Sequence, residues 1–260
     1  VVVDGKAQQV LYPKVYLAKQ PAKSVDAMGG IISGKAIVSN TNADILNQGI
    51  MTADTIVLGA HDIENIGRID GRKVTIKASQ DVINTGNIHG EKQVNINAGR
   101  DINVGAHVNR LQHHDIVGRQ GTIGVGEKGD LVLSAKRDVN LKGAIVYTGD
   151  NSKATIEAGQ NINLTTEALS AKKDMTVNSE NYNRTDRRTE LGTAILSDSN
   201  VNLHAGNDVN IRNGIVNSEH GLTSVEAGND VTITNGQSYS RDEYLSLIHI
   251  SEPTRLGMIS

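Results

Sequence analysis

DILNQGI at residues 44–50, DIENIG at residues 62–67 and DVINTG at residues 81–86 are three copies of one short unit. Their first aspartates are Asp44, Asp62 and Asp81, and Asp101 follows at nearly the same spacing. A second aliphatic stretch lies between the copies, at residues 56–58, 74–76 and 94–96, and an alanine follows it two positions on. A match this long and this regular indicates an internal repeat, and the repeat decides the fold.

The second half of the chain carries a looser form of the same unit, aliphatic-x-Ala-Gly-x-Asp/Asn-aliphatic-x-aliphatic. Its units are spaced slightly more widely, for example from Asp208 to Asp230 and from Asp138 to Asn161. We expect a structural role, at the corners between strands, for Asp44, Asn47, Gly49, Asp62, Asn65, Gly67, Asp81, Asn84, Gly86, Asp101, Asp138, Asn161, Asp208 and Asp230.

Apolar and polar residues alternate with a period of two over short stretches, and Gly, Asn or Asp interrupts the alternation at short, regular intervals. This pattern predicts short β-strands and excludes amphipathic helices. A β-sandwich has strands of similar length but does not repeat one sequence at such a constant spacing. We therefore predict an all-β fold, a right-handed parallel β-helix in which each repeat forms one coil and like residues stack, with extra-helical loops or hairpins. Asn and Asp at the corners would hydrogen-bond in ladders along its axis.

The composition supports such a solenoid and excludes several classes of function. The 27 Gly and the many Asn tolerate positive φ and suit tight turns, while the 3 Pro leave backbone N–H groups available for pairing. Phe and Trp are absent, so Ile, Val and Leu must build the core. The absence of Cys excludes disulfides and thiol chemistry. A net charge of −3 offers no basic surface, so we expect no nucleic-acid partner.

Breaks in the repeat divide the chain into segments. Residues 1–35 are predicted to be a linker or the end of a preceding region, 36–104 to form tight coils, 105–130 an excursion, and 131–244 looser coils with a charged excursion at about 165–193. The chain begins Val1-Val2-Val3 without Met, so we expect a fragment of a longer protein. Leu245 to Arg255 resembles one reading frame of a transposase-type sequencing adapter, which predicts that residues 245–260 are an assembly artefact.

The Ala-Gly-x-Asp-aliphatic-x-aliphatic units resemble the haemagglutinin repeats of filamentous haemagglutinin and of the effector proteins of contact-dependent growth inhibition. The resemblance covers about residues 36 to 244 and rests on about eight units. It implies a very long exoprotein, secreted to the cell surface of a Gram-negative bacterium through an outer-membrane two-partner secretion transporter. The family's amino-terminal secretion domain, its Val-Glu-Asn-Asn boundary motif and its toxin domain do not occur within these residues.

The resemblance also implies the function. We expect a structural stalk that presents and helps deliver a carboxy-terminal toxin, with the target-cell surface or outer membrane as its partner. The alternative is an adhesin that binds host or neighbouring cells, and a β-helical carbohydrate-active enzyme is a remote third possibility. Any toxin or nuclease activity would belong to a domain outside this chain, so we expect no enzyme and no small-molecule substrate.

Three groups of residues are candidates for chemical sites. His113-His114-Asp115 could be a metal pair, but adjacent residues of an extended chain point in opposite directions, which favours a solvated loop. The repeated aspartates lack the Gly-Gly-x-Gly-x-Asp nonapeptide of calcium-binding β-helices and recur with the repeat, as corner residues do. Arg184, Arg187 and Arg188 lie beside Asp186 and Glu190, which is typical of a solvated charged face. We predict no catalytic residue, no metal and no cofactor.

Overall fold

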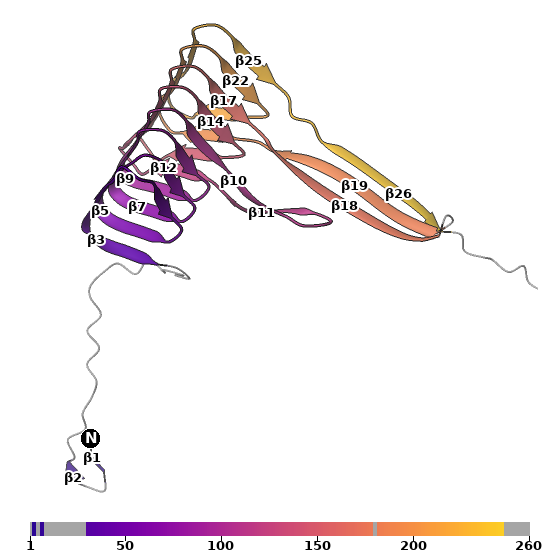
Figure 1. Cartoon of the computed structure of the whole chain (residues 1–260), viewed down its shortest axis with the longest axis horizontal. Helices are drawn as coiled ribbons and strands as arrows, with labels where there is room; N and C mark the ends of the chain where they lie inside the picture. Colours follow the sequence, from indigo (N-terminus) through magenta and orange to yellow (C-terminus); the bar gives the residue numbers. More distant parts are fainter. Residues whose placement is uncertain (1, 4–5, 8–29, 179–180, 247–260) are drawn as a thin grey trace, which may run out of the picture.

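The computed structural model describes residues 2–3, 6–7, 30–178 and 181–246. Within these ranges the chain consists of strands and turns without any helix. No membrane-spanning helix is therefore found in the described residues. Parallel strands stack in a β-solenoid of about nine turns (Figure 1). The prediction of an all-β, parallel solenoid is therefore confirmed.

One face of the solenoid is a column of short strands that pair in parallel, one strand from each coil. Its strands are β4 (Ile45–Asn47), β6 (Ile63–Asn65), β8 (Val82–Asn84), β10 (Ile102–Arg110), β14 (Val139–Lys142), β17 (Ile162–Thr165), β22 (Val209–Arg212) and β25 (Val231–Thr234).

The other two faces are formed by the longer part of each repeat. In the tight coils this part is a single strand that contributes to both faces: β3 (Ile31–Asn40), β5 (Ile50–Ala60), β7 (Arg68–Ala78) and β9 (Asn87–Ala98). In the looser coils it is divided into a first arm, with β12 (Thr122–Val125), β15 (Ile145–Thr148), β20 (Ala194–Ser197) and β23 (Ile215–Ser218), and a second arm, with β13 (Asp130–Ala135), β16 (Lys153–Ala158), β21 (Val201–Ala205) and β24 (Thr223–Ala227). The first half of β9 pairs with β12 and its second half with β13, so the division begins there.

The core consists of columns of aliphatic side chains that follow from the pairing register. One column contains Leu58, Ile76, Ile96, Leu133, Ile156 and Leu203, and a neighbouring column contains Ala60, Ala78, Ala98, Ala135, Ala158 and Ala205. All of these side chains are buried. Each large buried aliphatic side chain contributes about 1.5–3 kcal/mol, and alanine at the corner leaves room for the chain to turn.

A buried asparagine ladder replaces aliphatic residues in the first coils of the short-strand face. Asn47 donates its amide to Oδ1 of Asn65 at 2.7 Å, and Asn65 donates to Oδ1 of Asn84 at 2.7 Å. Asn65 and Asn84 are completely buried. In the stack, the amide N–H of one asparagine donates to the side-chain oxygen of the next. These hydrogen bonds compensate for the cost of burying the polar groups. From β10 onwards the equivalent position in the register is apolar, starting with Val104, which pairs with Asn84.

The predicted corner glycines are required by close approach between coils. A Cβ on Gly67 would lie 2.0 Å from the carbonyl oxygen of Gly49, and a Cβ on Gly86 would lie 2.1 Å from that of Gly67. Positive φ, which the composition suggested as the reason for the many Gly and Asn, occurs in the described residues at Lys128, Gly143, Asn151 and Asn213. The repeated glycines are therefore explained by steric contact rather than by backbone handedness.

The remaining strands lie outside the stacked coils. They are β1 (Val2–Val3), β2 (Lys6–Ala7), β11 (Asp115–Gln120), β18 (Glu167–Asn178), β19 (Asn181–Leu191) and β26 (Tyr239–Ser246). β10 extends beyond its coil to pair with β11, and β18, β19 and β26 form a three-stranded antiparallel sheet beside the solenoid. We call this three-stranded sheet the side sheet.

These bounds differ in part from the predicted segments. β3 pairs with β5 from Ile31 onwards, so the solenoid already includes residues 31–35 of the predicted linker. The first excursion ends earlier than predicted, because β12 is back in the coil at Thr122. Most of residues 1–29 and residues 247–260 lie outside the described residues, so the linker and adapter interpretations stay predictions.

Replacement of Asn65 by leucine should strongly destabilise the fold. The substitution removes the side-chain acceptor of the Asn47 amide, which keeps only the carbonyl of Arg68, and the donor to Oδ1 of Asn84. Each buried group left unsatisfied costs about 1–3 kcal/mol. Asn140 is the matched control, because it belongs to a ladder that solvent can reach. Urea denaturation followed by circular dichroism should show a large loss for Asn65→Leu and a small loss for Asn140→Leu. Equal losses would contradict the ladder's role.

Candidate functional site: the corner ladder and the side sheet

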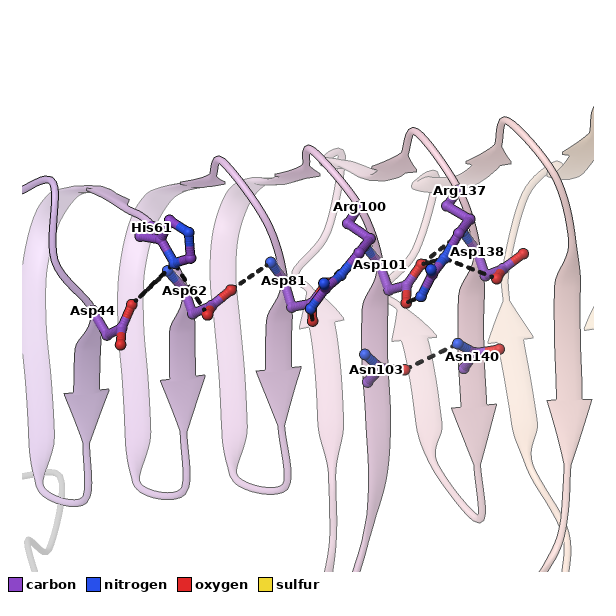
Figure 2. A network of polar contacts seen from close by, with 10 residues as sticks. All are labelled: Asp44, His61, Asp62, Asp81, Arg100, Asp101, Asn103, Arg137, Asp138 and Asn140. Carbon is purple, nitrogen blue, oxygen red and sulfur yellow. Dashed lines mark hydrogen bonds and ion pairs between the residues drawn. The ribbon is translucent and has the colours of Figure 1, made fainter.

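The predicted corner aspartates form one hydrogen-bond ladder along an edge of the solenoid (Figure 2). In each rung a side-chain Oδ1 accepts the backbone N–H of the corner residue in the next coil, at 2.8 to 3.3 Å. The ladder continues without a break through Asp44, Asp62, Asp81, Asp101, Asp138, Asn161, Asp208 and Asp230. It satisfies a backbone donor at every turn, where strand pairing cannot do so.

The residue before several ladder positions reaches back to the carboxylate of the previous coil. Arg100 donates its Nε to Asp81 at 2.7 Å, and Arg137 donates its Nε to Asp101 at 2.7 Å. Amides make the equivalent contact from Asn207 to Asn161 and from Asn229 to Asp208. At these corners the side chain of one coil therefore accepts two hydrogen bonds from the next coil, one from a backbone N–H and one from a side chain of the same turn.

Ion pairing shifts the titration of these groups. The pKa of Asp81 lies below its ordinary value, because Arg100 donates to its carboxylate and because the N–H of Asp101 does so as well, while burial opposes both effects. The hydrogen bond to Asp101 likewise raises the pKa of Arg137. At this rung the ladder therefore favours the charged form of the Asp81 carboxylate.

A second ladder, which the repeat pattern did not predict, lies on the outward side of the short-strand face. Asn140 donates to Asn103, Asn163 donates to Asn140 and Asn210 donates to Asn163, at 2.9 to 3.0 Å. Its signal in the sequence is the asparagine between the two aliphatic residues of each unit, as in DIN at 101–103 and DVN at 138–140. The repeat pattern leaves that position variable.

Two exposed groups have enough closely spaced ligand atoms to hold a cation. They are Asp44 with His61 and Asp62, and Asp198 with Glu219 and His220. Their carboxylates already have protein partners, because Oδ1 of Asp44 accepts the N–H of Asp62 and Oδ1 of Asp198 contacts Nδ1 of His220 at 2.7 Å. The first group belongs to the corner ladder, and the second connects the turn between β20 and β21 with the turn between β23 and β24.

His113 and His114 lie in the exposed turn between β10 and β11, as expected for a solvated loop, and the segment also contacts another excursion. The carbonyl of His113 accepts the N–H of Lys172 at 2.6 Å, and His114 makes an antiparallel bridge with Ala171. Asp115 accepts the N–H of Ser170 at 2.8 Å. The segment therefore attaches the β10–β11 hairpin to β18.

Two nearly buried glutamates anchor the base of the side sheet. Glu167 forms an ion pair with Lys142 at 2.7 Å and another with Arg110. Glu190 forms an ion pair with Arg212 at 2.6 Å. Burial alone would raise the pKa of Glu190, but the N–H of Gln237 and the guanidinium of Arg212 lower it overall. These pairs join side-sheet residues to strands of the solenoid.

The side sheet and the solenoid enclose an open cleft of about 1160 Å³. Its lining includes Arg110, Asp115, Lys172, Arg188, Arg212 and Tyr239.

Arg184, Arg187 and Arg188, which are close together in the sequence, do not form one cationic cluster. Arg184 pairs with Asp174 at 3.3 Å, and Arg187 pairs with Asp242 at 3.2 Å.

The acids of the corner ladder follow the solenoid axis one coil at a time. In the rungs described above, Oδ1 of each side chain accepts a backbone N–H. Glycoside hydrolysis typically uses two carboxyl groups that converge on one bond, and these positions follow the coil repeat instead. The arrangement suits a structural element that fixes the register of successive coils.

Comparison with known families gives one match. Residues 174–249 match the family described as "Hemagglutinin repeat". The chain has no significant match among curated proteins or among solved structures. Together with the β-solenoid, the match fits a filamentous haemagglutinin-type repeat region, which confirms the resemblance seen in the sequence. It suggests a structural, adhesin-like stalk of a secreted or surface-exposed protein.

The variant Asp81→Asn should separate the charge of the ladder from its hydrogen bonds. An amide oxygen can still accept the N–H of Asp101, as Asn161 does for Asp208, but the ion pair with Arg100 is lost. We expect a small loss of stability at pH 7, because Arg100 is solvent-exposed and its ion pair is screened. Because the pKa of Asp81 is lowered in the folded protein, its contribution is present above the unfolded pKa of about 3.9 and disappears as the pH falls through the folded pKa.

Urea denaturation at pH 7 and at lower pH measures this difference, with Asp81→Ala as the comparison. The alanine variant loses the acceptor as well, so it should be less stable than Asp81→Asn at both pH values. If Asp81→Asn and Asp81→Ala were equally destabilised at pH 7, the backbone rung would be unimportant.

Proposed function

We propose that this chain is a segment of a stiff stalk in a secreted exoprotein, and that the stalk presents and helps deliver a toxic domain of the same protein to a neighbouring cell. The hemagglutinin-repeat match and the parallel solenoid support the stalk. Delivery in contact-dependent growth inhibition is the finer part of the proposal. It rests on the resemblance of this chain, with tight coils followed by looser coils with charged excursions, to the effector proteins of contact-dependent growth inhibition.

The unbroken corner ladder is the observation that carries the mechanical role. It links successive coils from Asp44 to Asp230, parallel to columns of buried aliphatic side chains. Bending the rod would stretch backbone pairs, ladder bonds and core contacts on the same side together. Several weak interactions per coil thereby add up to a rigid spacer.

An adhesin is the second candidate, and the side sheet favours it. The sheet of β18, β19 and β26 lies outside the coils (Figure 1). It exposes charged residues such as Lys173, Arg188 and Asp242. A spacer needs no such projection. Exposed polar loops on a rigid scaffold commonly carry binding functions, so the sheet gives the stalk a surface with which to contact a cell.

Export through an outer-membrane transporter of a Gram-negative bacterium belongs to the same proposal. A solenoid suits this route, because each coil can stack on the previous one as it emerges and no coil depends on residues far away in the sequence. The partner on the other side would be the surface or outer membrane of the target cell.

Removal of one whole coil tests the stalk in a strain that carries the complete gene. Deletion of residues 44–61 joins Ala43 to Asp62 and keeps the repeat in phase, so surface display should persist. Deletion of residues 44–52 removes half a repeat, breaks the register and should abolish display, as antibody labelling of intact cells would show. Equal display of both deletion variants would argue against a stacked stalk.

Mixed culture distinguishes the two candidate functions. Producing cells and marked target cells are grown either in contact or separated by a filter, with the display-negative half-coil variant as the control. Toxin delivery predicts loss of target viability that requires both contact and display. Attachment of targets without loss of viability would establish adhesion and exclude delivery.

A further inference from the structure

The excursions leave the solenoid at one corner, and in the looser coils they do so at every second coil. The exits follow Gly105, Thr165 and Thr234, which occupy equivalent positions in the register of the short-strand face. In the intervening coils the chain turns at once, through Gly143 with φ 61° and Asn213 with φ 47°. Excursions and tight turns therefore alternate.

This alternation matches the width of a hairpin. Paired strands lie about 4.8 Å apart, both within a side sheet and between stacked coils, so a two-stranded hairpin is as wide as two coils are high. Consecutive hairpins can then join edge to edge without a gap. The contacts agree: β11 and its turn meet β18, β18 pairs with β19, and β19 pairs with β26.

β26 occupies the place of an outgoing strand. It follows β25 as β18 follows β17, and its pairing with β19 is antiparallel, with Arg188 opposite Tyr239 and Arg184 opposite Glu243. In the described part of the chain no strand pairs with its other edge. An edge of this kind presents a row of backbone donors and acceptors ready for pairing.

Charges on one face of the side sheet alternate across the strands as well as along them. One row reads Asp174, Arg184, Glu243, and the next row reads Lys172, Asp186, Arg241. Neighbours in each row have opposite charges, and two of these contacts are ion pairs, Arg184–Asp174 at 3.3 Å and Lys172–Asp186 at 3.6 Å. Opposite charges on paired strands stabilise the pair.

We propose that the free edge of β26 is a binding site for one further extended strand, with a cation opposite Glu243 and an acid opposite Arg241. The occupant is an extended strand of a partner, with the charge order that β19 has in Arg184 and Asp186. Such a strand extends the side sheet by one antiparallel member. This inference is independent of whether the stalk delivers a toxin or adheres to cells.

A peptide with the sequence of residues 181–191 serves as the probe. It should bind the full chain, whereas a peptide with Arg184→Asp and Asp186→Arg exchanged should bind about tenfold more weakly, because two opposite-charge pairs become like-charge pairs. Fluorescence polarisation of labelled peptides measures both affinities. Equal binding of the two peptides, or no binding of either, would overturn the proposal.

Cysteine cross-linking locates the binding edge, because the chain contains no cysteine of its own. A peptide carrying Arg187→Cys should form a disulfide with Ser240→Cys in β26, since these positions face each other where β19 pairs with β26. Lys173→Cys in β18 is the matched control at the opposite edge of the sheet. Preferential cross-linking to Lys173→Cys would place the peptide at the wrong edge. Formation of Ser240→Cys homodimers that exclude the peptide would assign the edge to a second copy instead.

Discussion

Backbone pairing between coils is the constraint on which this structure depends. A single coil buries few side chains, and the cost of ordering it exceeds what those side chains return. Each coil is therefore stable only on the hydrogen-bonding edge of its neighbour. Every position must then tolerate a copy of itself directly above and below, which explains columns of isoleucine, alanine, glycine and asparagine where an ordinary domain would mix its residues.

The same constraint explains how much the sequence could predict. Stacking in register forces like residues into one position, so the recurring Asp44, Asp62 and Asp81 indicated both the solenoid and the corner ladder. The glycine corners were predicted for a wrong reason, because contact between coils is invisible in a single repeat. The outward ladder of Asn103 and Asn140 was missed because an asparagine between two aliphatic residues also suits an ordinary exposed strand position.

The excursions could be predicted only as interruptions. Their sequences do not repeat with the coils, and their partners lie far away in the chain, as His114 and Ala171 do. β19 and β26, which lie about fifty residues apart in the chain, pair as antiparallel neighbours in one sheet. Antiparallel pairing favours complementary charges rather than identical ones, so a search for repeats finds the coils more readily than the side sheet.

The corner ladder has a direction. Each carboxylate receives its donor from the coil that comes later in the chain, as Asp62 does from Asp81 and Asp208 does from Asp230. Each stacked coil therefore presents the acceptor that the following coil requires. The two ends of the stack differ in consequence: a coil added at the carboxy-terminal end supplies a donor to the ladder, and a coil added at the amino-terminal end supplies an acceptor.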